Sequence, residues 1–143
     1  MPVLLITGGS LGAQAINEIV EKSLGALTDK FNVIHLGGKQ CGGELFKPRY
    51  ARLTFTDDMP GVYSATDIAV TRGGANTLFE LASLAIPALV IPLPKGASRG
   101  DQIDNARYFS SLGCAKLFFS PTLPRKVLLR NSTRFSPAPI GCG

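Results

Sequence analysis

Short apolar runs alternate along the chain with longer stretches whose apolar residues recur at helical spacing. Continuous apolar runs are typical of strands in a parallel sheet that is covered on both faces. We expect strands at residues 3 to 7, 31 to 36, 53 to 55, 68 to 71, 88 to 91 and 115 to 119. Helical patterns run from residue 16 to 27, from the aspartates at 57 and 58 to 65, from 78 to 84, and from 101 to 112. The alternation predicts an α/β fold, with a parallel sheet of about six strands and helices on both faces.

Four glycine-rich or polar segments follow predicted strands. They occupy residues 8 to 13, 55 to 59, 73 to 80 and 95 to 105. On sheets of this kind, ligands bind outside the carboxyl ends of the strands. We therefore expect these four segments to meet at one ligand site.

The last part of the chain differs from the rest. Residues 121 to 143 contain four basic residues, four prolines and no acidic residue, so they hold most of the net charge of +5. We predict a folded domain over residues 1 to 120 and an irregular basic tail over residues 121 to 143, resulting from truncation or a change of reading frame. Because the positive charge lies in the tail, we expect no binding of nucleic acid.

The composition is that of one soluble domain. The chain has 143 residues, of which 45% are hydrophobic and 17% are charged. It contains no apolar run of 18 residues and no amino-terminal signal pattern, so we expect no transmembrane segment and no secretion. Cys41, Cys114 and Cys142 have no metal or redox spacing, which favours unpaired thiols in a reducing cytoplasm.

The first glycine loop follows the first predicted strand and precedes a helix. It contains Gly9, Ser10 and Gly12. Glycine loops in this position can hold a phosphate, and Ser10 would supply a hydroxyl. Tight strand-to-helix turns also use glycine for steric reasons alone, so this loop taken alone favours neither interpretation.

The second glycine turn, at Gly73 and Gly74, opens the helix that carries Thr77 and Glu80. Backbone N–H groups at a helix start favour an anion. An alternative is that Thr77 and Glu80 form a capping box, which needs no ligand. The sequence has neither a nicotinamide-type fingerprint with an acidic residue after the second strand nor a P-loop. A ribose-binding carboxylate must then come from elsewhere, and Glu80 is the candidate.

The predicted helix from residue 101 places Gln102 and Asn105 on one face, where both could reach sugar hydroxyls. Polar residues in a first helical turn are also ordinary. Asp57 and Asp58 are adjacent in an extended segment, so their carboxylates diverge and we predict no metal site. The single histidine, His35, lies in a predicted strand, where a structural role is the more frequent one.

Four motifs together carry a resemblance to a family. They are Gly8-Gly9-Ser10-Leu11-Gly12-Ala13-Gln14, Phe55-Thr56-Asp57-Asp58-Met59, Arg72-Gly73-Gly74-Ala75-Asn76-Thr77-Leu78-Phe79-Glu80 and Gly100-Asp101-Gln102-Ile103-Asp104-Asn105-Ala106. In type, order and spacing they resemble the carboxy-terminal half of the MurG family, which are glycosyltransferases of family 28 with the two-domain GT-B architecture. The resemblance covers residues 3 to about 120. It implies a Rossmann-like domain that binds a UDP-sugar donor without a metal ion or other cofactor.

The resemblance also implies a role for each residue. Ser10, Gly9 and Gly12 would hold the diphosphate, and the backbone of Thr56, beside Phe55, would pair with uracil. Glu80 would bind the ribose hydroxyls, and Gln102, helped by Asn105, would select the sugar. The remaining implied substrate-binding residues are Ala75, Asn76 and Thr77 at the phosphates and sugar, with Leu78, Phe79 and a supporting Arg72 in the same motif.

By resemblance, the activity is transfer of N-acetylglucosamine from its UDP donor to undecaprenyl-diphospho-muramoyl-pentapeptide in peptidoglycan synthesis. The family binds this acceptor, and holds its general base, in an amino-terminal domain that this chain does not supply. We therefore expect the isolated chain to be inactive, and the full enzyme to lie in the cytoplasm at the inner face of the cell membrane. Two alternatives remain open: a donor-binding subunit of a split lipid-linked N-acetylglucosaminyltransferase, and a non-catalytic UDP-sugar-binding module.

Overall fold

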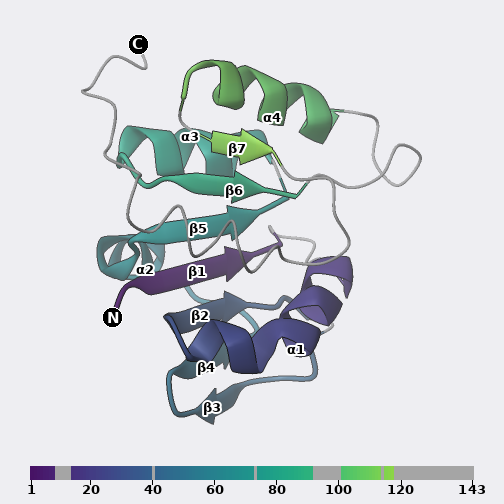
Figure 1. Cartoon of the computed structure of the whole chain (residues 1–143), viewed down its shortest axis with the longest axis vertical. Helices are drawn as coiled ribbons and strands as arrows, with labels where there is room; N and C mark the ends of the chain where they lie inside the picture. The colour runs from purple at the N-terminus through teal and green to yellow at the C-terminus, as the bar shows by residue number, and fades with distance from the viewer. Residues whose placement is uncertain (9–13, 40, 73, 92–100, 114, 118–143) are drawn as a thin grey trace.

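The computed structural model describes residues 1–8, 14–39, 41–72, 74–91, 101–113 and 115–117. It has the predicted α/β architecture, with a single twisted sheet and helices on both faces (Figure 1). The strands are β1 (Val3–Thr7), β2 (Asn32–Leu36), β3 (Leu45–Lys47), β4 (Tyr50–Leu53), β5 (Ile68–Thr71), β6 (Ala88–Val90) and β7 (Ala115–Leu117). The helices are α1 (Gln14–Thr28), α2 (Met59–Ala65), α3 (Ala75–Ser83) and α4 (Asp101–Ser111).

The strand order across the sheet is β3-β4-β2-β1-β5-β6-β7. All neighbouring strands are parallel except β3 and β4, which are antiparallel. The central strands β1 and β5 are buried almost throughout, which explains their continuous apolar sequences. The order reverses direction beside β1, because the chain first builds outward through β2 and then returns to add β5. Ligands of doubly wound sheets bind at such a reversal.

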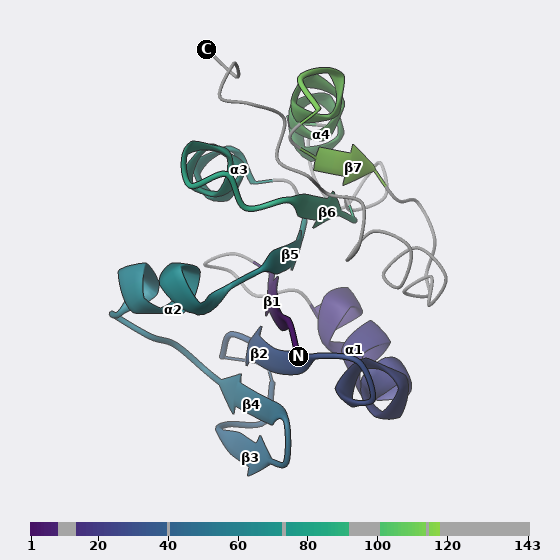
Figure 2. The ribbon, with the colours of Figure 1, turned by 60° about the vertical axis from the view of Figure 1, so that its left-hand side comes forward.

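Two separate hydrophobic cores pack on the two faces of the sheet. Figure 2 shows α1 on one side of the sheet and α2 and α3 on the other. The core under α1 contains Ile16, Val20 and Phe31. The opposite core contains Tyr63 from α2, Leu78 and Leu81 from α3, and Phe109 from α4. The prediction of a sheet covered on both faces is therefore confirmed.

The third strand and the sheet edge differ from the prediction. The strand expected at residues 53 to 55 is β4, which lies earlier, and β3 adds an edge strand that the sequence pattern did not predict. Only Tyr50 of β4 is fully buried, and β3 has no buried residue, so neither strand has an apolar run. Phe55 follows the strand and is 76% exposed. Edge strands that face solvent lack the strong apolar signal of central strands.

Candidate functional site

A cavity of about 200 Å³ opens at the carboxyl edge of the sheet. Its walls come from the ends of β1, β2 and β4, from the segment between β4 and α2, and from α2 and α3. The lining residues are Thr7, Leu36, Gly38, Thr54, Phe55, Thr56, Met59, Tyr63, Thr77 and Glu80. Of the sequence-predicted site residues, the structure thus brings Phe55, Thr56, Thr77 and Glu80 together around one space.

Glu80 lies in α3 and its carboxylate is held by a tyrosine. The Tyr63 hydroxyl in α2 donates a hydrogen bond of 2.5 Å to Oε2 of Glu80. Burial, together with this bond to the carboxylate, raises the pKa of Tyr63 above its ordinary value of 10.0. The phenol therefore stays protonated and acts as the donor. The sequence alone does not mark Tyr63 as a cavity residue, because nothing in its own segment indicates a contact with the next helix.

The capping-box interpretation of Thr77 and Glu80 is wrong. The N-cap of α3 is Gly74, and no side chain caps the helix start. Thr77 is the third residue of the helix, so it lies too far into α3 to act as the N-cap. The amides of the first turn are left without intrahelical partners, and Thr77 lines the cavity.

The segment before α2 is held by two local hydrogen bonds. The Thr56 hydroxyl accepts from the backbone N–H of Asp58 at 3.1 Å. The Asp58 carboxylate caps α2 by accepting from the N–H of Gly61 at 3.1 Å, so Asp58 is the N-cap of the two aspartates at the predicted helix start. A Cβ atom on Gly61 would lie 2.2 Å from Oδ2 of Asp58, so a larger residue there would displace the capping carboxylate. The Thr56 hydroxyl is thus engaged within the turn, while its residue still faces the cavity.

Arg72, at the end of β5, reaches the start of the first glycine loop. Its Nη1 donates to the carbonyl of Gly8 at 3.3 Å, across the carboxyl edge of the sheet. Partial burial lowers the pKa of the guanidinium below its usual value. Gly9, Ser10 and Gly12 lie outside the described residues, so the diphosphate role of this loop stays a prediction.

Four predicted site residues within the described part of the chain do not line the cavity, namely Ala75, Asn76, Leu78 and Phe79. Ala75 and Asn76 form the first turn of α3. Leu78 is 2% exposed and belongs to the core, whereas Phe79 is 61% exposed and packs edge-on against Phe109, with ring centroids 5.1 Å apart.

α4 begins at Asp101, as predicted, and it carries Gln102 and the half-buried Asn105. The side chain of Gln102 is outside the described part of the chain. The substrate roles of these residues stay predictions.

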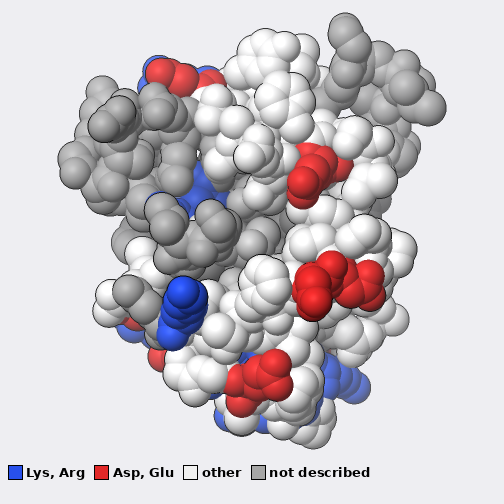
Figure 3. All heavy atoms as spheres, turned by 180° about the vertical axis from the view of Figure 1, so that it is seen from behind, with Lys and Arg blue, Asp and Glu red and all other residues white. Residues whose placement is uncertain are grey.

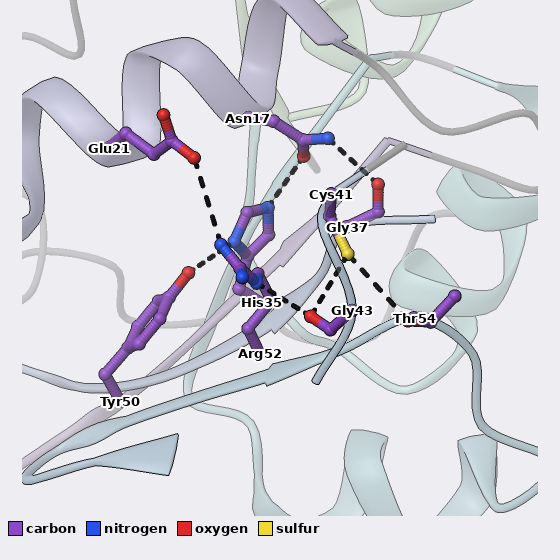
Figure 4. A network of polar contacts seen from close by, with 9 residues as sticks. All are labelled: Asn17, Glu21, His35, Gly37, Cys41, Gly43, Tyr50, Arg52 and Thr54. Carbon is purple, nitrogen blue, oxygen red and sulfur yellow. Dashed lines mark hydrogen bonds and ion pairs between the residues drawn. The ribbon is translucent and has the colours of Figure 1, made fainter. Parts of the chain in front are cut away.

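A second polar cluster, on the α1 side of the sheet, contains His35 (Figure 4). His35 is 1% exposed, its Nε2 contacts Oδ1 of Asn17 at 2.8 Å, and its Nδ1 contacts the Tyr50 hydroxyl at 2.8 Å. Because Oδ1 can only accept, Nε2 carries the proton and Tyr50 donates to Nδ1. Burial, and secondly the charge of Arg52, lower the pKa of His35 to about 4. These contacts agree with a structural role for His35.

The same cluster fixes the turn after β2. The Nδ2 of Asn17 donates to the carbonyl of Gly37 at 2.9 Å. The buried free thiol of Cys41 lies 3.6 Å from the carbonyl of Gly43, which also accepts from Nε of Arg52 at 2.9 Å. We call Asn17, His35, Tyr50 and Gly37 the histidine network. It ties α1 to β2, to β4 and to the turn that leads into the cavity.

Charged side chains on the face opposite to that of Figure 1 are dispersed. Figure 3 shows separate groups of acidic side chains, with the basic side chains lying apart from one another rather than in one stripe. Within the described residues, no group of three or more His, Cys, Asp or Glu side chains could hold a metal ion. Over the same residues, no helix combines the length and the apolar character needed to cross a membrane.

Known proteins resemble this chain in sequence and in fold. The family model described as "Glycosyltransferase family 28 C-terminal domain" matches residues 3–132. The UDP-N-acetylglucosamine–N-acetylmuramyl-(pentapeptide) pyrophosphoryl-undecaprenol N-acetylglucosamine transferase of Clostridium botulinum is 42% identical over 132 residues, which cover 90% of this chain and 37% of that protein. The enzyme of the same name from Streptococcus sanguinis is 43% identical over 116 residues, which cover 81% of this chain and 33% of that protein.

A solved structure agrees with these relatives. The crystal structure of MurG from Acinetobacter baumannii has a TM-score of 0.72 and 32% identity, covering 93% of this chain and 41% of that one. The chain thus spans little more than a third of the length of the curated relatives it matches. The family model, the sequence relatives and the fold all agree, and the chain belongs to glycosyltransferase family 28, matching the carboxy-terminal domain of that family.

Proposed function

We propose that the cavity binds the nucleotide of UDP-N-acetylglucosamine, and that this chain is the donor-binding half of an N-acetylglucosaminyltransferase of peptidoglycan synthesis. The proposed acceptor is the undecaprenyl-linked muramoyl-pentapeptide that the names of the relatives specify. The main support is that a family 28 domain carries Glu80 at the edge of the sheet where ligands of such folds bind.

The chemistry of the cavity suits a nucleoside diphosphate. A carboxylate accepts hydrogen bonds, and the two ribose hydroxyls donate them. Within the described residues, Tyr63 engages Oε2 of Glu80 and leaves Oε1 available. The exposed ring of Phe55 and the backbone of Thr56 are proposed to hold uracil, since the Thr56 hydroxyl is already engaged by Asp58. The start of α3, with Thr77 on the cavity wall, favours the negatively charged phosphates.

The acceptor site and the general base are proposed by comparison with the longer relatives. Because the chain spans about 37% of their length, the acceptor site and the general base are assigned to a separate amino-terminal domain. Selection of the sugar by Gln102 and Asn105, the supporting charge of Arg72, and a position at the inner face of the cell membrane in the full enzyme belong to the same proposal.

Isothermal calorimetry on the full 143-residue chain tests the nucleotide site directly. We expect UDP and UDP-N-acetylglucosamine to bind and ADP-glucose to bind much more weakly. Hydrogen bonds to a charged group contribute about 1.5 to 3 kcal/mol, so Glu80→Ala should weaken UDP binding about tenfold or more.

The matched control for that substitution is Asp29→Ala. Asp29 is an exposed carboxylate between α1 and β2, at the opposite edge of the sheet. Its replacement by alanine should leave UDP affinity unchanged. Equal UDP affinity of Glu80→Ala and the native chain would contradict the assignment of Glu80. Failure of the native chain to bind UDP would contradict the nucleotide site as a whole.

A further inference from the structure

Tyr63 belongs both to the hydrophobic core and to the wall of the cavity. It is 8% exposed and lies in the core between the sheet and helices α2 and α3. The hydroxyl of this buried side chain donates a hydrogen bond to Oε2 of Glu80. The bond joins two helices, since Tyr63 belongs to α2 and Glu80 to α3.

Glu80 has few other restraints. The residue is exposed, and over the described part of the chain the Tyr63 hydroxyl is the partner of its carboxylate. A glutamate side chain with several rotatable bonds loses entropy when a ligand fixes it, and an existing hydrogen bond to a rigid group reduces that loss. The Tyr63 ring is such a group because the core packs around it.

We propose that Tyr63 is a positioning residue for nucleotide binding: its hydroxyl holds one carboxylate oxygen of Glu80, so that the other is presented to the ribose hydroxyls. This inference rests on the proposed function of the cavity. It also links the two walls of the site, because α2 follows directly from the segment that contains Phe55 and Thr56. A shift of α2 would then move the Tyr63 hydroxyl and with it the Glu80 carboxylate.

A purely structural role is the alternative, in which the buried phenol needs an acceptor and Glu80 happens to supply one. Tyr50 provides a matched case within the same chain. It is also buried and its hydroxyl also donates to a side chain, but its partner is His35 in the histidine network, and it does not line the cavity. The two tyrosines therefore differ mainly in whether the acceptor faces the cavity.

The experiment compares Tyr63→Phe with Tyr50→Phe, each in the native chain and together with Glu80→Ala. Phenylalanine keeps the ring and the packing and removes only the hydroxyl. The ligands are UDP and 2′,3′-dideoxy-UDP, which lacks both ribose hydroxyls. Affinities are measured by calorimetry, and thermal unfolding of each variant is recorded so that all titrations are made on folded protein.

We expect Tyr63→Phe to weaken UDP binding about three- to tenfold, as for the loss of one hydrogen bond. The same substitution should hardly change affinity for dideoxy-UDP, and should add no further loss to Glu80→Ala, because the two residues act through one contact. Tyr50→Phe should lower the unfolding temperature and leave UDP affinity within about twofold of the native value.

Three results would overturn the inference. They are native UDP affinity in Tyr63→Phe, equal losses for UDP and dideoxy-UDP, and additive losses when Tyr63→Phe is combined with Glu80→Ala. The first result would assign Tyr63 to packing alone, and the other two would mean that Tyr63 affects UDP binding by a route that does not pass through Glu80. In all three cases UDP binding and its dependence on Glu80 would remain intact. Failure of the proposed function differs from this, because the native chain would then not bind UDP or Glu80→Ala would not weaken it.

Discussion

The histidine network and the Tyr63–Glu80 pair use the same kind of contact in different surroundings. In each, a buried tyrosine donates its hydroxyl to a side chain on another element. The acceptor His35 is buried, both of its ring nitrogens are engaged, and its lowered pKa keeps it neutral. The acceptor Glu80 is exposed beside a cavity and keeps an oxygen without a partner among the described residues.

This difference in burial predicts that the histidine network contributes mainly to folding stability and the Tyr63–Glu80 pair mainly to ligand binding. When every donor and acceptor of a buried group is engaged within the protein, removal of one partner leaves another unsatisfied, and the free energy of unfolding falls. When a group is exposed beside a cavity, water can replace its contact with the protein, so its removal costs less stability but deprives a ligand of a hydrogen-bond acceptor. Substitutions in the two regions should therefore change different quantities.

The largest expected effect comes from protonation of His35. Its pKa is about 4 in the folded protein and 6.5 as the reference for the unfolded chain, so the unfolded state binds more protons between these values. The stability from the neutral histidine is complete above about pH 6.5 and is lost as the pH falls toward 4. At roughly 1.4 kcal/mol per pKa unit, the loss in free energy of unfolding is about 3 kcal/mol.

Urea unfolding at a series of pH values measures this loss. Because the chain has a single histidine, the ring proton resonances in an NMR titration report its pKa without ambiguity. A midpoint near 4 is expected. A midpoint near 6.5 would mean that His35 is open to solvent and that the histidine network does not persist in solution.

Removal of Asn17 is the next largest effect. Asn17→Ala leaves both the Gly37 carbonyl and Nε2 of His35 without their buried partner, and each unsatisfied group costs about 1 to 3 kcal/mol. We expect the free energy of unfolding to fall by about 2 kcal/mol or more, while UDP affinity stays within about twofold. Asn32→Ala, at an exposed position at the start of β2, is the control and should change neither quantity. A large loss of UDP affinity in Asn17→Ala would show that the network also shapes the cavity.

The regions also differ in how far the sequence predicted them. The central strands were predictable because burial on both faces demands continuous apolar runs, as in β1 and β5. The position of Glu80 on the cavity wall was predictable because its helix follows a strand that ends at the carboxyl edge of the sheet. The β3–β4 hairpin was not, since Arg49 adopts a left-handed conformation, with φ of 61°, where the usual glycine signal is missing.

Side-chain contacts between separate helices could not be predicted from the sequence, because no local pattern encodes them. The bond from Tyr63 to Glu80 joins residues 17 apart on two helices, and no local spacing rule relates them. The capping-box alternative does not hold because α3 begins at Ala75, which makes Thr77 part of the helix rather than its cap. Helix boundaries are set by which backbone groups find partners, and a Thr-x-x-Glu pattern fits either register.

The smallest expected effect is at Thr56. This residue lies on the cavity wall like Glu80, but its hydroxyl is engaged within the protein like the side chains of the histidine network. That hydroxyl is engaged by the N–H of Asp58 within the turn before α2. Thr56→Val keeps the shape and removes this acceptor, so we expect a stability loss of about 0.5 to 1 kcal/mol. UDP affinity should stay within about twofold, since only the backbone of Thr56 is proposed to contact uracil. Thr56→Ser keeps the hydroxyl and should retain most of the stability. If Thr56→Val lost UDP affinity and Thr56→Ser kept it, the hydroxyl itself would contact the ligand, which would contradict a contact through the backbone alone.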